Sequence, residues 1–277
     1  MTKASEPVAP RPASTVLLLR DGGAGIEVLM VTRNVASDFA SGALVFPGGR
    51  VDAADAEAAT HGQCRPVSGV DPAKMAFRVA GVRETFEEAH LLLARPKGSD
   101  MLLSGSELDD IERRLRDRLG REPLFTDIVA TGEVELATDL LVPYAHWITP
   151  VGPPKRFDTH FFLAPAPGDQ VAAHDGREAV DTIWIAPSTA VSQADEKRVT
   201  LVFATRMNLL KLGRQATIAA ALSAAHGEAV VTVCPELAQT EDGPVLRIPL
   251  AAGYGVSEVP ATGIPRAWVP GVTSNRA

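Results

Sequence analysis

Three glutamates and an arginine lie close together in the segment Arg83-Glu84-Thr85-Phe86-Glu87-Glu88-Ala89. Side chains three and four residues apart are neighbours on a helix, so Glu84, Glu87 and Glu88 would gather on one face beside Arg83. Like charges at this spacing repel each other unless a cation lies among them. Carboxylate oxygens are the ligands that Mg2+ prefers. The segment therefore predicts a divalent metal site, whose expected chemistry is metal-assisted hydrolysis of a phosphate anhydride.

A glycine turn upstream belongs to the same predicted site. The apolar residues 42–45 are typical of a short strand, and Phe46-Pro47-Gly48-Gly49-Arg50 follows as a tight turn. Glycine has no side chain, so its backbone can approach an ion or a phosphate closely. The alternative is a solvated helix face with an Arg83–Glu87 ion pair, which would contribute about 0.3–0.5 kcal/mol. The glycine turn favours the metal site over that alternative.

The elements that position these residues follow from hydrophobic periodicity. Asp71 and Pro72 are a typical helix cap and first-turn pair, and apolar residues recur after them at helical spacing. The predicted buried stripe comprises Met75, Val79, Val82, Phe86 and Ala89, and the glutamates lie off it. Upstream, the apolar runs 14–19 and 27–32 predict a hairpin around the glycine-rich residues 21–25.

The rest of the chain mixes helical and extended patterns. The charged, amphipathic residues 106–119, ended by Gly120, predict a helix, and residues 123–130 predict a shorter one. Strands are expected at 141–148, 159–164 and 182–185, and helices at 187–191, 201–212 and 215–225. Residues 229–233 and 245–249 are expected to form a terminal hairpin. This order predicts an α+β fold.

The glycine turn and the glutamate segment together resemble the signature box of the Nudix hydrolases. Residues 39–52 and 76–78, Trp147-Ile148-Thr149-Pro150 and Arg156-Phe157-Asp158-Thr159 are similar to the peroxisomal acyl-coenzyme A diphosphatase branch of that superfamily. The resemblance implies the Nudix fold, a mixed β-sheet sandwiched between α-helices, with a helical insertion and a C-terminal helical and hairpin extension. We expect a domain over residues 14–255 with insertions at about 52–72 and 100–132. Residues 1–13 are expected to be a disordered lead-in and residues 256–277 a tail.

The sequence departs from the general Nudix box in its length and in one acid. The insertion at about 52–72 separates Gly49 from Arg83, and the acyl-CoA branch resembles this chain in carrying such an insertion. Met75 stands eight residues before Arg83, where the box normally has a glutamate that is peripheral to the metal.

The resemblance implies a role for each residue of the box. Glu84, Glu87 and Glu88 would bind Mg2+ or Mn2+ and act in catalysis, and Gly48 would offer its carbonyl oxygen to the metal. Arg83 would orient a glutamate through charge-assisted hydrogen bonds.

Residues outside the box would complete the site. Glu178 is the candidate for a further acid that binds metal or acts as general base, with an ordinary loop glutamate as the alternative, and Asp181 is a weaker candidate. Arg50, Lys155 and Arg156 are the cations expected to bind the substrate's diphosphate.

Three histidines stand near these segments. His90 occupies the position of the glycine that normally ends the signature helix in a left-handed turn, a conformation that histidine adopts less readily. We expect His90 to be a helix terminus. His146 and His160 lie in strand-like segments, where a lone histidine is usually a core or edge residue, and we assign them no role.

By analogy, the expected activity is hydrolysis of the diphosphate in coenzyme A (CoA) or acyl-CoA to 3',5'-ADP and a 4'-phosphopantetheine product. Hydrolysis of ADP-ribose, NADH or a dinucleotide would use the same metal site with different pockets. A catalytically silent nucleotide-binding module is the third possibility. The intact glutamates weigh against it, whereas His90 and Met75 leave room for it.

Composition bounds the class of protein. At 277 residues, 45% of them hydrophobic, the chain can bury the core of one elaborated domain. A net charge of −7 argues against general nucleic-acid binding, so the expected partner is a small-molecule nucleotide substrate, and a homodimer stays open. Cys64 and Cys234 are expected to be free thiols.

The two ends of the chain and its apolar runs bear on its location in the cell. Residues 1–13 lack the apolar core of a secretory signal, and residues 275–277 differ from the peroxisomal Ser-Lys-Leu signal. No apolar run reaches the roughly 18 residues of a membrane span. We expect a soluble cytoplasmic protein.

Overall fold

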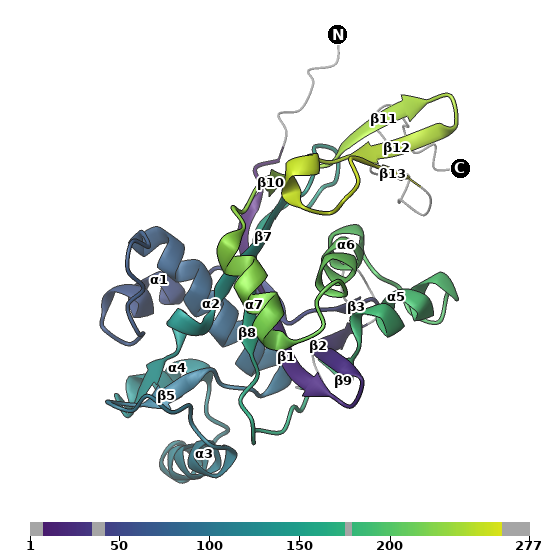
Figure 1. Cartoon of the computed structure of the whole chain (residues 1–277). Coiled ribbons are helices and arrows are strands. Elements are labelled where there is room, and N and C mark those ends of the chain that lie inside the picture. The colour runs from purple at the N-terminus through teal and green to yellow at the C-terminus, as the bar shows by residue number, and fades with distance from the viewer. Residues whose placement is uncertain (1–7, 35–41, 175–178, 262–277) are drawn as a thin grey trace, which may run out of the picture.

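A central mixed β-sheet organises the computed structural model, which describes residues 8–34, 42–174 and 179–261 (Figure 1). The strands follow the order β10-β7-β8-β1-β2-β3, with β4 paired to β1 and β9 paired to β2. Their bounds are β1 (Arg11–Gly22), β2 (Gly25–Arg33), β3 (Leu44–Val45), β4 (Gly48–Arg50), β7 (Val142–Ile148), β8 (Phe157–Pro165), β9 (Ala179–Ile185) and β10 (Thr232–Val233). The β1–β8 and β10–β7 pairs are parallel and the other pairs of this sheet are antiparallel.

Helices cover both faces of this sheet. They are α1 (Ala53–Thr60), α2 (Pro72–Ala89), α3 (Gly105–Leu119), α4 (Phe125–Ala130), α5 (Pro187–Asp195), α6 (Phe203–Leu212) and α7 (Ile218–Gly227). On β1, Val16 and Leu18 enter the core under α2, while Leu17 and Leu19 enter the core under α6 and α7. A strand buried on both faces is a continuous apolar run, which explains residues 14–19. The α+β sandwich predicted from the sequence is confirmed.

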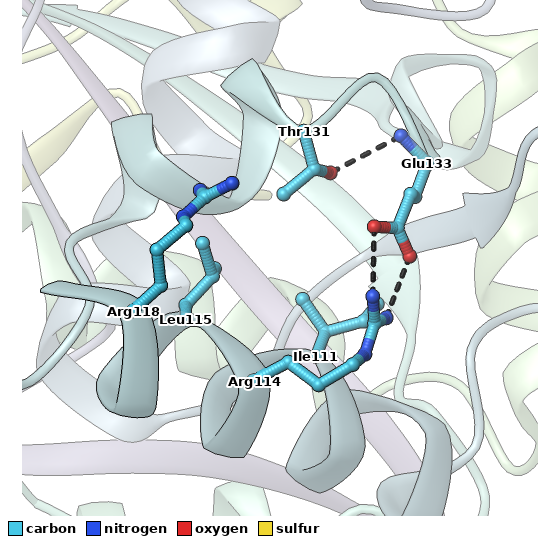
Figure 2. A pocket seen from close by; sticks show the side chains of 6 residues that line it. All are labelled: Ile111, Arg114, Leu115, Arg118, Thr131 and Glu133. Carbon is cyan, nitrogen blue, oxygen red and sulfur yellow. Dashed lines mark hydrogen bonds and ion pairs between the residues drawn. The ribbon is translucent and has the colours of Figure 1, made fainter.

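The two predicted insertions lie beside α2. Residues 52–72 contain α1, and residues 100–132 contain α3 and α4. A two-stranded ribbon of β5 (Ala94–Pro96) and β6 (Val134–Leu136) flanks the second insertion. Between α3 and the segment that enters β6 is a hollow of about 170 Å3, crossed by an Arg114–Glu133 ion pair (Figure 2). The hollow is smaller than the roughly 300–1,000 Å3 of typical small-molecule sites, and no signature glutamate lines it.

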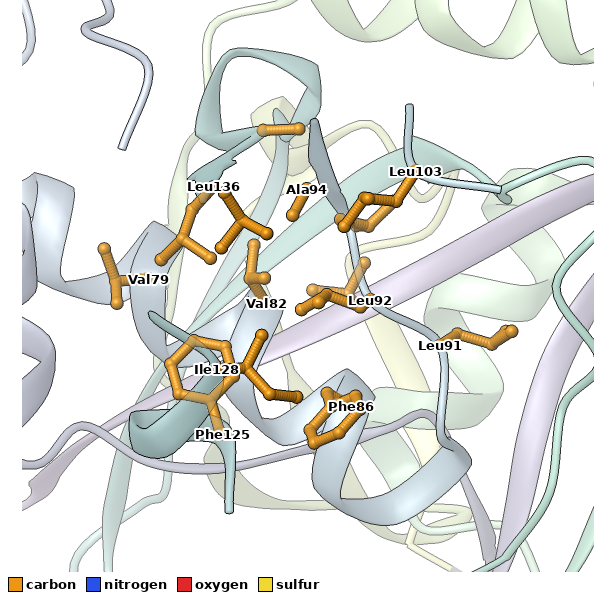
Figure 3. Packing of buried hydrophobic residues seen from close by; sticks show 14 of the residues in the cluster. Val79, Val82, Phe86, Leu91, Leu92, Ala94, Leu103, Phe125, Ile128 and Leu136 are labelled. Atoms are coloured by element: carbon orange, nitrogen blue, oxygen red, sulfur yellow. The ribbon is translucent and has the colours of Figure 1, made fainter. Parts of the chain in front are cut away.

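Helix α2 is more deeply buried than its periodicity predicted. Asp71 caps it by accepting a hydrogen bond from the Ala73 N–H, and Pro72 occupies its first turn, both as expected. The predicted stripe is buried, and Val79, Val82 and Phe86 pack against Phe125 and Ile128 of α4 (Figure 3). The helix is buried beyond that stripe, however, also at Ala76, Arg78, Ala80, Gly81 and Thr85. The sheet, α1 and α4 contact it from several sides, so a single-stripe pattern was too simple.

The C-terminal hairpin differs from the prediction. Residues 245–249 were expected to pair with 229–233, but β12 (Gly243–Arg247) pairs with β11 (Glu236–Thr240). Thr232 and Val233 form β10 at the edge of the main sheet, beside His146 and Trp147 of β7. Of the apolar residues in 229–233, Val233 is buried by this pairing and Val231 is partly buried. In contrast, β11 is mostly polar and partly exposed, so its sequence pattern was weak.

Both predicted terminal segments contain strand residues. β1 begins at Arg11, within the predicted lead-in, and β13 (Glu258–Pro260) pairs with β12 within the predicted tail. Among the described residues, no helix is both long and apolar enough to cross a membrane.

Candidate metal-binding and catalytic site

Arg83 holds two of the three signature glutamates. Its Nη1 lies 2.9 Å from Glu84 Oε1 and 2.8 Å from Glu87 Oε2. Glu84 and Glu88 are buried, with relative exposures of 8% and 3%, whereas the Glu87 side chain is 45% exposed. The expectation that Arg83 contacts the glutamates is confirmed, and Glu87 is the most accessible of the three carboxylates.

The glycine turn lies against the glutamates, as expected. The Gly48 N–H donates to Glu88 Oε2 over 2.9 Å. A Cβ atom added to Gly49 would lie 2.4 Å from Glu84 Oε1, and one added to Gly48 would lie 2.5 Å from the Ser14 carbonyl oxygen. Real Cβ atoms do not approach other atoms so closely, so glycine is required at position 48, where the neighbour is backbone, whereas a side chain at position 49 would force the Glu84 carboxylate to move.

Asp55 is a partner of Arg83 that was not predicted from the sequence. Asp55 Oδ1 accepts from Arg83 Nε at 2.8 Å, and Oδ2 accepts from Nη2 at 3.0 Å. Asp55 is 1% exposed, and its Oδ2 also accepts from the Asp52 N–H at 2.7 Å. It belongs to α1 in the first insertion, so an inserted helix supplies the carboxylate that fixes Arg83. Nothing local marks Asp55, because it stands 28 positions before Arg83.

Arg83 also ties the helix to the glycine turn. Its Nη2 donates to the Arg50 carbonyl oxygen at 2.8 Å. Burial alone would lower the pKa of the Arg83 guanidinium, but its hydrogen bond to Asp55 and the charges of Glu84 and Asp55 outweigh burial and raise that pKa. Arg83 is therefore a permanent cation that fixes the turn, the inserted helix and two glutamates relative to one another.

These residues fit a divalent cation. Asp55 and the three glutamates bring four carboxylates together, and Arg83 offers them one positive charge. Because Gly49 has no Cβ atom, the Glu84 carboxylate can lie directly against the backbone of the glycine turn. Hard carboxylate oxygens and a close backbone are the donor set of Mg2+ and Mn2+ sites. Glu84, Glu87 and Glu88 are the residues that would hold the ion, with the Gly48 carbonyl as a further donor.

The candidate diphosphate-binding cations have different environments. Arg50 is exposed on β4, beside the turn, and Lys155 is exposed before β8. Arg156 is buried, and its guanidinium donates to the carbonyl oxygens of Val8, Thr149 and Pro150 at 2.8–3.1 Å. These contacts hold the chain before β1 against the β7–β8 loop, a structural role that the sequence did not indicate. Substrate binding by these three cations stays a prediction.

The further acid predicted for the site, Glu178, lies outside the described residues. Asp181 lies on β9, where its side chain is exposed and its partner in the sheet is Thr32. The structure therefore leaves both as predictions.

His90 is the helix terminus that the sequence predicted. Its φ and ψ of 55° and 30° are left-handed, and its N–H donates to the Phe86 carbonyl oxygen at 2.8 Å. Its ring lies 5.3 Å from the Phe86 ring, and its Nε2 lies 3.3 Å from Glu112 Oε2 on α3. The hydrogen bond to Glu112 raises the pKa of His90. Ring and ion-pair contacts thus hold histidine where glycine is usual.

A family model and several curated proteins match this chain. The model of the NUDT19 Nudix domain matches residues 58–209, which include the whole glutamate segment. The acyl-coenzyme A diphosphatase NUDT19 of Homo sapiens is 30% identical over 239 residues, covering 72% of this chain and 60% of that protein. The Gallus gallus protein of the same name is 28% identical over 236 residues, covering 65% and 59%. The chain thus spans about three fifths of the length of these relatives.

A solved structure supports the fold independently. The crystal structure of a Nudix hydrolase from Alicyclobacillus acidocaldarius superposes with a TM-score of 0.64 at 28% identity. The match covers 78% of this chain and 96% of that one. With the family model matching more than half of its length, this chain belongs to the NUDT19 family of Nudix hydrolases.

Proposed function

We propose that this protein hydrolyses the diphosphate of CoA or acyl-CoA, giving 3',5'-ADP and 4'-phosphopantetheine or its acyl form, with Mg2+ or Mn2+. The observation that carries the proposal is the fixed carboxylate set. Arg83 holds Glu84 and Glu87, and the Gly48 N–H holds Glu88. The name of the human and chicken relatives, acyl-coenzyme A diphosphatase, supports the substrate class.

A divalent cation in this site would offset the charge of the diphosphate and lower the pKa of an attacking water. The chain's own residues contribute position. Asp55 and the Arg50 carbonyl fix Arg83, so two glutamates keep their places before substrate arrives. Because the Glu87 side chain is exposed, its carboxylate is the one that the substrate can approach most directly. Arg50 and Lys155 are exposed, and their side chains would bind phosphate oxygens of the substrate.

The test is a product screen by mass spectrometry with Mg2+ and with Mn2+. The panel is CoA, several acyl-CoAs, ADP-ribose, NADH and a diadenosine polyphosphate, with Glu87→Gln as the inactive control. We expect 3',5'-ADP from the CoA substrates with the wild type and a loss of several orders of magnitude in Glu87→Gln. AMP from ADP-ribose or NADH instead would assign the protein to the other Nudix substrates.

Two further outcomes would count against the proposal. No product from any substrate would favour the silent module. A near-normal rate in a folded Glu87→Gln variant would remove Glu87 from the catalytic set. Circular dichroism shows whether the variant is folded. Because the Glu87 side chain is exposed, we expect the substitution to change the unfolding free energy by no more than about 0.5 kcal/mol.

A further inference from the structure

A second set of metal-ligating side chains lies outside the carboxylate site. His146 on β7 is the direct cross-strand partner of His160 on β8, and Asp158 precedes His160 by two positions, on the same face of the strand. Ligand atoms of His146, Asp158 and His160 all lie within 4.8 Å of one another, and each residue is partly exposed. An ion could therefore reach them from solvent.

His146 is held as metal-bound histidines usually are. Its Nδ1 lies 2.8 Å from the Oγ1 of Thr232 on β10, and its Nε2 faces Asp158 Oδ1 in a hydrogen bond. A metal-ligating imidazole typically keeps its other nitrogen in a hydrogen bond that fixes the ring, and Thr232 supplies one. The Nε2 atom is thus already directed at a carboxylate that could share an ion with it.

The ring of His160 is surrounded by aromatic rings. Its ring stacks on that of His146 at 4.2 Å and 20°, and lies 4.4 Å from the Phe77 ring of α2. In the described part of the chain, no group hydrogen-bonds a ring nitrogen of His160. No protein group of the described residues therefore occupies these nitrogens, and a neutral imidazole nitrogen is a common metal ligand.

We propose that His146, Asp158 and His160 form a binding site for a first-row transition metal ion of the Zn2+ class. Two imidazoles and one carboxylate are a known zinc ligand set, which leaves a fourth position for water. Bonds of about 2.0–2.1 Å place tetrahedral ligand atoms roughly 3.3–3.4 Å apart, so side-chain rotation must bring the three ligands closer. The ion would replace the hydrogen bond between His146 and Asp158, and the proton of that hydrogen bond would pass to solvent.

The register relates this second site to the first. His160 is the cross-strand partner of Ser14 on β1, and Ser14 is the cross-strand partner of Gly49 on β4. Two strand spacings amount to about 10 Å, so the two sites lie on one face of the sheet under α2. The Ser14 hydroxyl between them is fully buried and has no hydrogen-bond partner among the described residues. The sites differ in chemistry, because imidazole favours Zn2+ while carboxylates suit Mg2+ and Mn2+.

The experiment is a calorimetric titration of the chelator-treated protein with Zn2+ in excess Mg2+, which fills the carboxylate site. We expect one Zn2+ per chain in the wild type and at least tenfold weaker binding in His160→Phe, which keeps a ring against Phe77, and in His146→Gln. Thr232→Val should weaken binding about 10- to 100-fold by releasing the His146 ring. His226→Gln changes an exposed histidine on α7 and is the matched control, with unchanged binding.

X-ray absorption at the zinc edge of the loaded wild type identifies the ligands without any variant. Imidazole scattering from two histidines supports the site, and an all-oxygen shell overturns it. Equal Zn2+ affinity in the wild type and a folded His160→Phe or His146→Gln variant would also overturn it. None of these results depends on hydrolase activity, so this proposal and the proposed function can fail separately.

Discussion

Asp55 binds Arg83 through both carboxylate oxygens, at 2.8 Å and 3.0 Å, although the two residues come from different helices. Asp55 lies in the insertion that separates the glycine turn from the glutamate helix. The helix itself has Met75 where the general Nudix box has a glutamate. The inserted helix therefore brings an acid to this site from outside the signature helix.

Asp55→Asn should lower kcat/KM about 10- to 100-fold, because Arg83 loses the charge that fixes it and the glutamates lose a fixed partner. The apparent Mg2+ affinity, measured from the metal dependence of the rate, should fall with it. Glu57→Gln alters an exposed acid on the same helix and should leave both quantities unchanged. If Asp55→Asn lowers only thermal stability, Asp55 has no positioning role.

Gly49→Ala should reduce the rate by roughly 100-fold or more, because the added Cβ displaces the Glu84 carboxylate by about an ångström. The φ of Gly49 is not left-handed, so the effect is steric rather than conformational. Gly23→Ala is the control, since a Cβ at that position meets nothing within 4 Å. Steady-state kinetics of the two variants tests this, and full activity in Gly49→Ala would mean that Glu84 is not needed where it stands.

Arg156→Gln should destabilise the protein by about 2–4 kcal/mol, because three backbone carbonyls lose a charged donor. Lys155→Gln changes the neighbouring exposed cation and should alter unfolding free energy by less than about 0.5 kcal/mol. Denaturant unfolding measures both. If Arg156→Gln is as stable as the wild type and instead raises KM, its guanidinium acts on the substrate.

His160 should make the metal-free protein less stable in mild acid. Its folded pKa of about 4 lies below the ordinary value of 6.5, so between these values the unfolded chain binds a proton that the folded chain does not. Its contribution is therefore complete above about pH 6.5 and is lost as the pH falls towards 4. Thermal melts in chelator across this range should show a weaker pH dependence for His160→Phe. An identical dependence in both proteins would contradict the lowered pKa.

Local signals were sufficient for the parts of the fold that depend on neighbouring residues. Asp71 and Pro72 marked the start of α2, and Gly120 marked the end of α3, because caps and turns act within a few positions. The glutamates and the glycine turn were found in the same way. They lie at fixed spacings, and their approach was confirmed at Gly49 and Glu84.

Features that depend on tertiary pairing could not be predicted from the sequence. Asp55 meets Arg83 only because α1 packs on α2, and an isolated aspartate in a loop-like stretch has no periodic signal. His146 and His160 face each other through the register of β7 and β8, which depends on the folded sheet rather than on either strand alone. For the same reason, residues 229–233 were assigned to the wrong partner. Thr232 and Val233 of this segment pair with β7.

The parallel pairing of β1 with β8 bears on how the chain folds. Thr15 pairs with Phe161, so the partners are separated by 161 − 15 = 146 positions. Contacts of such high sequence separation slow folding, because a long loop must close before the pairing stabilises anything. During synthesis, β1 is made first, and its apolar centre lacks its β8 partner until that strand is made. A nascent chain halted before Phe157 therefore exposes an aggregation-prone strand, and we expect it to depend on chaperones until β8 is made.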